Sequence, residues 1–270
     1  MNFVNLVHKI LTESKPVILP SKVNILIDEI LNWVKSLCDP ELWNQNKVLF
    51  SGSEGKDFYF SNYVDNSHFL HNYKLRCFAN VSEHPYGKET SGSFAYSQHE
   101  NVVIIRIYND SNGLTLAQLK WAIRHEMMHA FDPALFNRFK NKNMFATSDR
   151  TKLEDDSNTY DSYVKYLTKP TPCSGRIPEE FTPRLNMLLQ DLSVEKWREF
   201  LNDINNKDNT DSEYIKKCLY RLVDVTTFAE VKKHILFGDL TALYHYLRDP
   251  YLKRKTLQKI FWFINNHTTQ

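Results

Sequence analysis

The sequence predicts an α+β fold in which a small, mostly antiparallel sheet is followed by one amphipathic helix and then by a larger helical lobe. Three observations support this prediction. Short β-prone runs are confined to residues 47–108. Apolar residues recur at helical spacing beyond residue 115. Glycine is scarce, with 7 in 270 residues, which favours helices over a turn-rich β protein. We expect two lobes, residues 1–133 and residues 134–270.

The first lobe is expected to begin with helices at residues 2–13 and 22–37 and to continue with five strands. The last two strands are separated by three residues, a length typical of a β-hairpin. The run Val102–Ile105 is continuously apolar, which predicts a strand buried on both faces. The five expected strands are Lys47–Phe50, Asp57–Phe60, Lys74–Ala79, Ser93–Gln98 and Val102–Tyr108.

A helix is predicted to follow the sheet directly and to start at a capping box. Thr115 supplies the N-cap hydroxyl and Gln118 the side chain three residues later. The helix should end at Asp132, because the residue before a proline avoids helical geometry. A stripe at three- and four-residue spacing is expected to face the core, formed by Leu116, Leu119, Ile123, Met127 and Ala130.

The second lobe is expected to be helical, after a polar and basic stretch at residues 137–152 that we interpret as a loop or lid. Capping boxes at Thr210–Glu213 and Thr227–Glu230 predict two of the helix starts. The expected helices are residues 154–167, 178–191, 194–205, 211–223, 228–236, 240–247 and 251–266.

Composition narrows the class of protein. The 34 basic and 32 acidic residues nearly balance, which argues against nucleic acid or a membrane surface as partner. The four cysteines are far apart and form no C-x-x-C pair, so reduced core thiols are expected rather than a zinc cluster. The start does not have the pattern of a signal peptide, and no apolar run predicts a transmembrane helix. We therefore expect a cytoplasmic location, with a virion as the alternative.

The five residues from His125 to His129 spell H-E-x-x-H on the predicted helix. Positions four apart lie on the same helix face, so His125 and His129 can both reach one metal ion. Glu126 then sits beside that ion. This arrangement suits a zinc ion that carries a water molecule with a carboxylate base next to it. Chance alone gives roughly 0.02 matches to the motif in a chain of this composition.

Two histidines do not complete a catalytic zinc site, which usually has three protein ligands. Our first choice for the third is Glu180, at the start of the helix that follows Pro178, and Glu179 is a weaker choice. Acidic residues at a helix start also simply complement its dipole. The remaining candidates for the third ligand lie in the acidic segment Leu153–Asp161, which could instead simply start a solvated helix; they are Glu154, Asp155, Asp156 and Asp161.

Three further residues are predicted to support the site. Asp132 is expected to accept a hydrogen bond from a ligand imidazole, or else only to end the helix before Pro133. Arg184, one turn after Glu180, is placed to orient that carboxylate or to pair with a substrate carboxyl group. Tyr163 is the expected donor to an oxyanion, with Tyr160 and Tyr166 as alternatives.

His125-Glu126-x-x-His129 after a hairpin, with a downstream glutamate, resembles the zincin metallopeptidases and is most similar to the gluzincin type. The resemblance covers about residues 93–190. It implies a two-lobed fold with zinc in the cleft, and a peptide substrate lying along Ser93–Gln98 or Val102–Tyr108. The stretch Pro178–Leu185 looks like a Pro-x-Glu-x-x-x-Arg element of small zincin-like proteins from tailed phages. Neither the metzincin continuation nor the downstream Asn-Glu-x-x-x-Asp pattern of thermolysin-like enzymes is present.

The sequence therefore supports two candidate functions. The first is a zinc metalloendopeptidase that acts on a protein or peptide, with Glu126 as general base. The alternative is a zincin-fold structural or assembly protein, for example a virion component, with weak or no protease activity. In that case the C-terminal helices would be the surface that binds a protein partner. A helical interaction domain with a chance motif and no metal is the remaining possibility.

Overall fold

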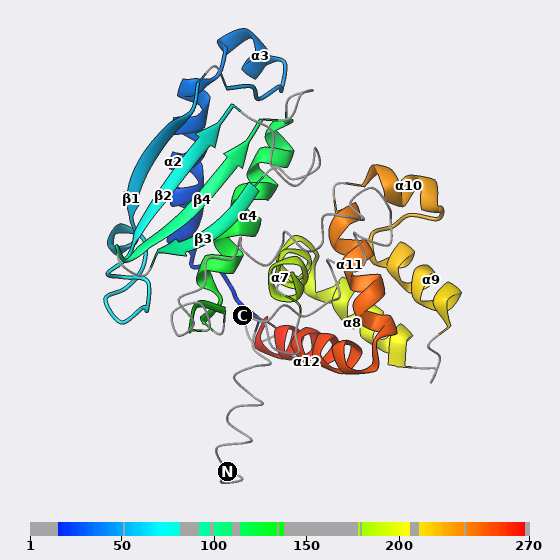
Figure 1. The fold of residues 1–270 in the computed structure, drawn as a ribbon. Helices are drawn as coiled ribbons and strands as arrows, with labels where there is room; N and C mark the ends of the chain where they lie inside the picture. Colours follow the sequence, from blue (N-terminus) through cyan, green and yellow to red (C-terminus); the bar gives the residue numbers. More distant parts are fainter. Residues whose placement is uncertain are drawn as a thin grey trace, which may run out of the picture. The chain divides into compact units, whose positions relative to one another are not determined.

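A computed structural model describes most of the sheet region and most of the C-terminal helices (Figure 1). The chain divides into two compact units. The first comprises residues 19–162, and the second comprises residues 1–18 together with residues 163–270. The predicted division after Pro133 stays a prediction. The expected helices at 2–13 and 154–167, and nearly all of the expected loop at 137–152, lie outside the described residues. Those residues are 16–50, 52–81, 92–97, 100–109, 114–133, 135–137, 178, 180–205, 211–234 and 236–267.

The described sheet of the first unit has four strands in the order β1-β2-β4-β3. β1 pairs with β2 and β3 pairs with β4 in antiparallel fashion, whereas β2 and β4 run parallel. Helices accompany this sheet, so the α+β class is confirmed. The strands are β1 (Glu54–Tyr59), β2 (Lys74–Asn80), β3 (Gly92–Ser97) and β4 (Val102–Tyr108).

Four of the five expected strands thus form, and the first is wrong. Instead of a strand at Lys47–Phe50, the chain makes two isolated bridges, from Val48 to Leu114 and from Phe50 to Cys38. Because Val48 and Phe50 bridge to two different segments, these two bridges do not extend into a strand. The Val48 bridge ties this segment to the residue just before Thr115, where the motif helix starts.

One face of the sheet forms the core of this unit. The register places Leu75, Val103 and Tyr96 side by side on that face, and Phe94 follows beside Ile105. All five side chains are buried. On the opposite face Val102 and Tyr108 are buried, whereas Ile104 and Arg106 between them are only half-buried. The prediction that β4 is buried on both faces is therefore confirmed for one face and for the two ends of the other. Helix α4 packs against β3 and β4.

Two helical segments precede the sheet. Helix α2 (Ser21–Leu37) confirms the helix expected at 22–37, and it packs against α4. The short helix α3 (Pro40–Asn44) starts at Asp39, whose side chain accepts hydrogen bonds from the backbone of Glu41 and Leu42. A 3-10 turn, η1 (Phe60–Asn62), follows β1. Cys38 and Cys77 are buried free thiols, as expected, and burial raises the pKa of each.

Helix α4 (Leu116–Phe131) carries the H-E-x-x-H motif and is fixed at its start by three interactions. Thr115 and Gln118 form the predicted capping box. The Leu116 backbone N–H donates to Asn46 Oδ1 at 3.0 Å. Leu114 exchanges backbone hydrogen bonds of 2.7 and 3.1 Å with Val48. The helix ends at Asp132, which has an extended backbone before Pro133, as predicted.

The second unit contains six described helices around one core. Trp197, Phe181 and Tyr246 are among its largest fully buried side chains. Thr227 and Glu230 form the predicted capping box, but the box predicted at Thr210 is wrong, because Asp211 is the N-cap of its helix. The helices are α7 (Phe181–Asp191), α8 (Val194–Asn205), α9 (Ser212–Leu222), α10 (Phe228–Lys233), α11 (Phe237–Arg248) and α12 (Pro250–His267).

Candidate metal centre

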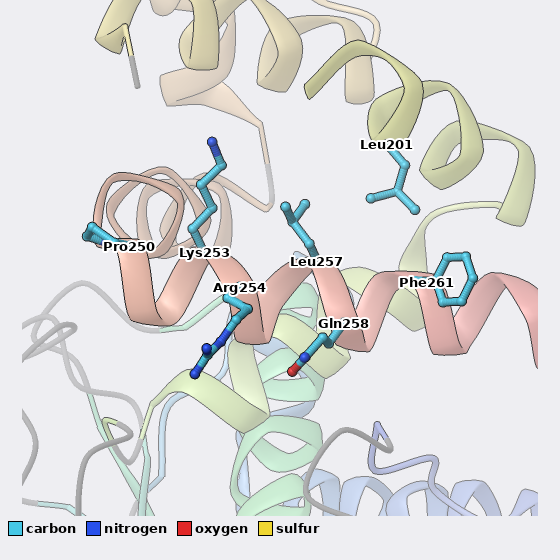
Figure 2. Close-up of a pocket in the computed structure, with 7 residues that line it drawn as sticks. All are labelled: Leu201, Pro250, Lys253, Arg254, Leu257, Gln258 and Phe261. Atoms are coloured by element: carbon cyan, nitrogen blue, oxygen red, sulfur yellow. The ribbon is translucent and has the colours of Figure 1, made fainter. Parts of the chain in front are cut away.

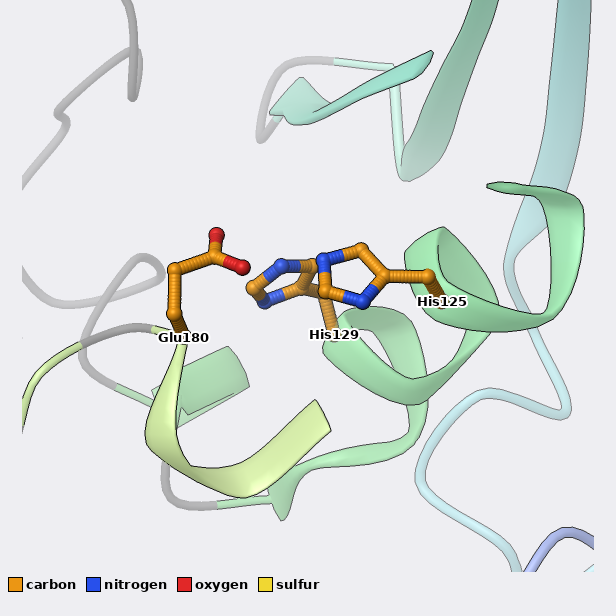
Figure 3. A group of neighbouring side chains, drawn as sticks. All are labelled: His125, His129 and Glu180. Atoms are coloured by element: carbon orange, nitrogen blue, oxygen red, sulfur yellow. The ribbon is translucent and has the colours of Figure 1, made fainter. Parts of the chain in front are cut away.

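The two motif histidines lie one turn apart on α4 and are both buried, His125 at 4% and His129 at 6% exposure. Their ring centroids are 5.0 Å apart and the ring planes meet at 84° (Figure 3). Leu119 and Ile123 anchor the preceding turns of α4 in the core, which fixes the rotation of the helix about its axis. Helical spacing thus brings the two imidazoles together as predicted.

Glu126 is also buried, at 7% exposure, and its side chain lies against the edge strand β3. A Cβ atom built on Gly92 would lie 3.1 Å from Glu126 Oε1 and 3.2 Å from its Cγ. Gly92 is the first residue of β3. Glycine at this position therefore leaves room for the carboxylate that the motif places beside the two histidines.

Each imidazole also has an aromatic neighbour. The ring of Trp121, one turn earlier on α4, stacks on His125 with centroids 4.8 Å apart and an interplanar angle of 21°. The ring of Phe94 on β3 stacks on His129 at 5.8 Å and 20°. Both contacts are close to parallel. The two histidines are therefore packed between rings as well as against each other.

Glu180 directly precedes α7 in the second unit and is 2% exposed. Its side chain does not cap the helix. Instead Glu180 Oε2 accepts a hydrogen bond of 3.2 Å from Arg184 Nε, and Arg184 Nη1 donates to Asp239 Oδ1 at 3.2 Å. Pro183 is the third residue of α7, where its missing N–H is tolerated, so the first turn forms normally. Two buried carboxylates thus share one buried guanidinium.

Among the described residues, His125, His129 and Glu180 form a set that could hold a metal ion. One ligand atom of each lies within 4.8 Å of those of the other two (Figure 3). Two imidazole nitrogens and one carboxylate oxygen are a ligand set that zinc accepts. The donor chemistry of this set therefore fits zinc.

The other predicted site residues fall into two groups. Asp132 is buried at 9%, and its Oδ1 accepts a hydrogen bond of 3.3 Å from the backbone N–H of Leu135. Its predicted bond to a ligand imidazole stays a prediction. The remaining residues lie outside the described part of the chain: the alternative ligands Glu179, Glu154, Asp155, Asp156 and Asp161, and the oxyanion donors Tyr163, Tyr160 and Tyr166.

Four residues around the motif were not found by sequence reasoning. Trp121 precedes His125 by four residues, so helical spacing alone would have placed it on the same face. Gly92 and Phe94 could not be found in this way, because their contact with α4 depends on how the strand packs under the helix. Asp239 is 55 residues from Arg184, and no local pattern connects the two.

The helical unit also has an open groove of about 450 Å³ along α12 (Figure 2). Its apolar residues include Leu201 from α8 and Leu257 and Phe261 from α12, and Lys253 and Arg254 add positive charge. This groove is a feature of the helices that we predicted as a partner surface. That role stays a prediction.

Comparisons of the chain with known protein families, with curated proteins and with solved structures find no match. Among the described residues, no helix is both long enough and apolar enough to cross a membrane.

Proposed function

We propose that the chain is a zinc-dependent metallopeptidase that hydrolyses peptide bonds in a protein or peptide substrate. The observation that carries this proposal is the burial of His125, Glu126 and His129 on α4 beside the edge strand β3. A purely structural zinc site needs its ligands but no carboxylate base between them. Here Glu126 lies in a space that Gly92 leaves open, next to the two histidines.

The zinc ligands in this proposal are His125, His129 and Glu180. Their donor chemistry, two imidazole nitrogens and one carboxylate oxygen, supports the assignment. Arg184 would hold one oxygen of Glu180 while the other binds the ion, and Asp239 would hold Arg184 in turn. Ligating carboxylates are commonly fixed by such partners, which restrict them to one orientation.

Glu126 would act as the general base. A zinc ion bound at this site would polarise a water molecule and lower its pKa toward neutrality. Glu126 would accept a proton from the water as its oxygen attacks the scissile carbonyl carbon. The carboxylic acid so formed would then give that proton to the leaving amine, so that the base is regenerated. An oxyanion donor such as Tyr163 stays a prediction.

The described sheet favours an extended substrate. β3 forms its edge and pairs with β4 on one side. An edge strand presents backbone N–H and C=O groups that an extended peptide can pair with. Of the two strands expected to line the substrate, β3 occupies the edge whereas β4 is internal. A peptide alongside β3 would pass the end of the strand where Gly92 meets Glu126.

The test is metal analysis and peptidase assay of untagged protein. We expect about one zinc per chain, the stoichiometry of a single catalytic site, and none in a His125→Ala, His129→Ala double variant. An unfolded, fluorescently labelled protein should be cleaved, a chelator should stop cleavage, and added zinc should restore it. Stoichiometric zinc without cleavage would favour the structural or assembly protein. Absence of zinc from the parent protein would refute the proposal.

A further inference from the structure

The two aromatic rings beside the motif have an arrangement that packing alone does not require. Trp121 and Phe94 come from different elements, yet each lies nearly parallel to a different motif imidazole, at 21° and 20°. The imidazoles themselves stand nearly perpendicular to each other, at 84°. Each histidine is thus held between one parallel ring and one perpendicular ring.

Such contacts restrict how an imidazole can turn. A ring that rotates about its χ2 angle loses a parallel stack, and an aromatic pair in good geometry contributes beyond the area it buries. Binding of a metal ion costs less when its ligands are already ordered. Ligand histidines are usually ordered by a hydrogen bond to the second ring nitrogen. Here stacked rings act on the imidazole plane itself.

The stack also favours the metal-bound form directly. An imidazole that donates electron density to a cation becomes more positive, and a positive group is attracted to the face of an aromatic ring. Indole is the strongest such partner. The Trp121 stack is also the closer one, at 4.8 Å against 5.8 Å for Phe94. Trp121 should therefore have the larger effect.

We infer that Trp121 and Phe94 are positioning residues that hold His125 and His129 in the orientation that binds the metal ion. Neither residue supplies a ligand atom. The inference deepens the proposed function and rests on it, because it concerns the same metal centre. It adds two residues whose removal should weaken metal binding while His125 and His129 remain intact.

The affinity test compares each ring with a buried ring of the same kind elsewhere in the same unit. Trp121→Leu is matched by Trp33→Leu on α2, and Phe94→Leu by Phe58→Leu on β1; Trp33 and Phe58 are buried and pack on each other. We expect Trp121→Leu to weaken zinc about tenfold and Phe94→Leu about threefold, the range of stacking energies. Trp121→Phe should recover part of the loss. The double variant should show the product of the two effects, because each ring acts on a different histidine.

A second readout needs no metal. In the metal-free protein the ring protons of His125 and His129 should resonate upfield of an ordinary histidine, and Trp121→Leu and Phe94→Leu should each remove the shift of one histidine only. If the parent binds no ion, the proposed function fails, and the resonances still report whether the stacks exist. If the parent binds zinc but the motif variants lose no more affinity than their controls, the positioning role is overturned.

Discussion

Gly92 on β3 lies directly against the carboxylate of Glu126 on α4. A Cβ atom at Gly92 would approach Glu126 Oε1 to 3.1 Å, closer than most such atoms come to a neighbour. The backbone of the edge strand therefore bounds the space in which the proposed base must move. A contact this close makes the position of Glu126 sensitive to a single methyl group.

Gly92→Ala should lower turnover without removing the zinc ligands. The added methyl group would displace the Glu126 carboxylate by a few tenths of an ångström, and proton transfer depends on hydrogen-bond geometry at that scale. We expect kcat to fall by about tenfold or more while zinc content stays at the parent level. Gly52→Ala is the control, since a Cβ atom there meets nothing within 4 Å. Unchanged kcat in Gly92→Ala would show that the contact does not constrain the base.

Glu126→Gln should separate binding of the metal from chemistry. The amide has nearly the same shape as the carboxylate but cannot accept the proton from water. Loss of a positioned base typically costs about 10²–10⁴-fold in rate. We therefore expect stoichiometric zinc, checked by metal analysis, together with cleavage reduced by that factor. A variant that cleaves as fast as the parent would exclude Glu126 as the base.

Arg184→Met should destabilise the second unit strongly. The substitution keeps most of the aliphatic length but takes the guanidinium away from the buried carboxylates of Glu180 and Asp239. Removal of one partner from a buried ion pair costs about 3–5 kcal/mol. Urea unfolding of the metal-free protein measures the loss. Arg221→Met is the control: Arg221 pairs with Asp203 at 3.0 Å with its side chain 57% exposed, and its loss should cost less than about 1 kcal/mol.

Asp57→Asn should change how stability depends on pH. Hydrogen bonds and charge from Arg76 and then Lys74, across the β1–β2 pair, lower the pKa of the Asp57 carboxyl group. A lowered pKa in the folded state means that the ionised group stabilises the fold above its unfolded pKa of about 3.9. This contribution is lost as the pH falls through the folded pKa.

At pH 7 we therefore expect Asp57→Asn to lower the free energy of unfolding by about 0.5–1 kcal/mol, the range of partly exposed ion pairs. The difference from the parent should shrink below about pH 4, and it should also shrink in about 1 M salt. Urea titrations across pH measure it. Glu54→Gln, which removes an exposed carboxylate from the same strand, is the control for the loss of one negative charge. A difference that persists at pH 2 would contradict the electrostatic explanation.

The sequence predicted local features well. The capping box at Thr115, the end of α4 before Pro133 and the hairpin between β3 and β4 all depend on residues within a few positions of one another. The strand expected at Lys47–Phe50 does not form. β propensity alone cannot predict whether a segment pairs with one neighbouring strand along its whole length. In the structure its residues bridge to two different segments.

Relationships between distant segments could not be predicted. The parallel pairing of β2 with β4 leaves β3 at the edge of the described sheet, although β3 lies between them in sequence. This strand order brings Gly92 and Phe94 under α4. No local sequence pattern predicts that placement. Glu180 was selected from several carboxylates by its place at a helix start. Asp239, which holds Arg184, could only be seen in three dimensions.

The anchoring of α4 at its start has a consequence for how the chain can vary. Each residue along an α-helix turns the direction of the side chain by about 100°. The first turn of α4 is fixed by contacts with Thr115, Asn46 and Val48. The directions in which the His125 and His129 side chains point therefore depend on the number of residues between that turn and each histidine. One residue inserted between Thr115 and His125 would turn both imidazoles by about 100° about the helix axis and move His129 away from Phe94 on β3. This segment should therefore accept substitutions at its exposed positions, such as Ala117 and Lys120, but no change in length.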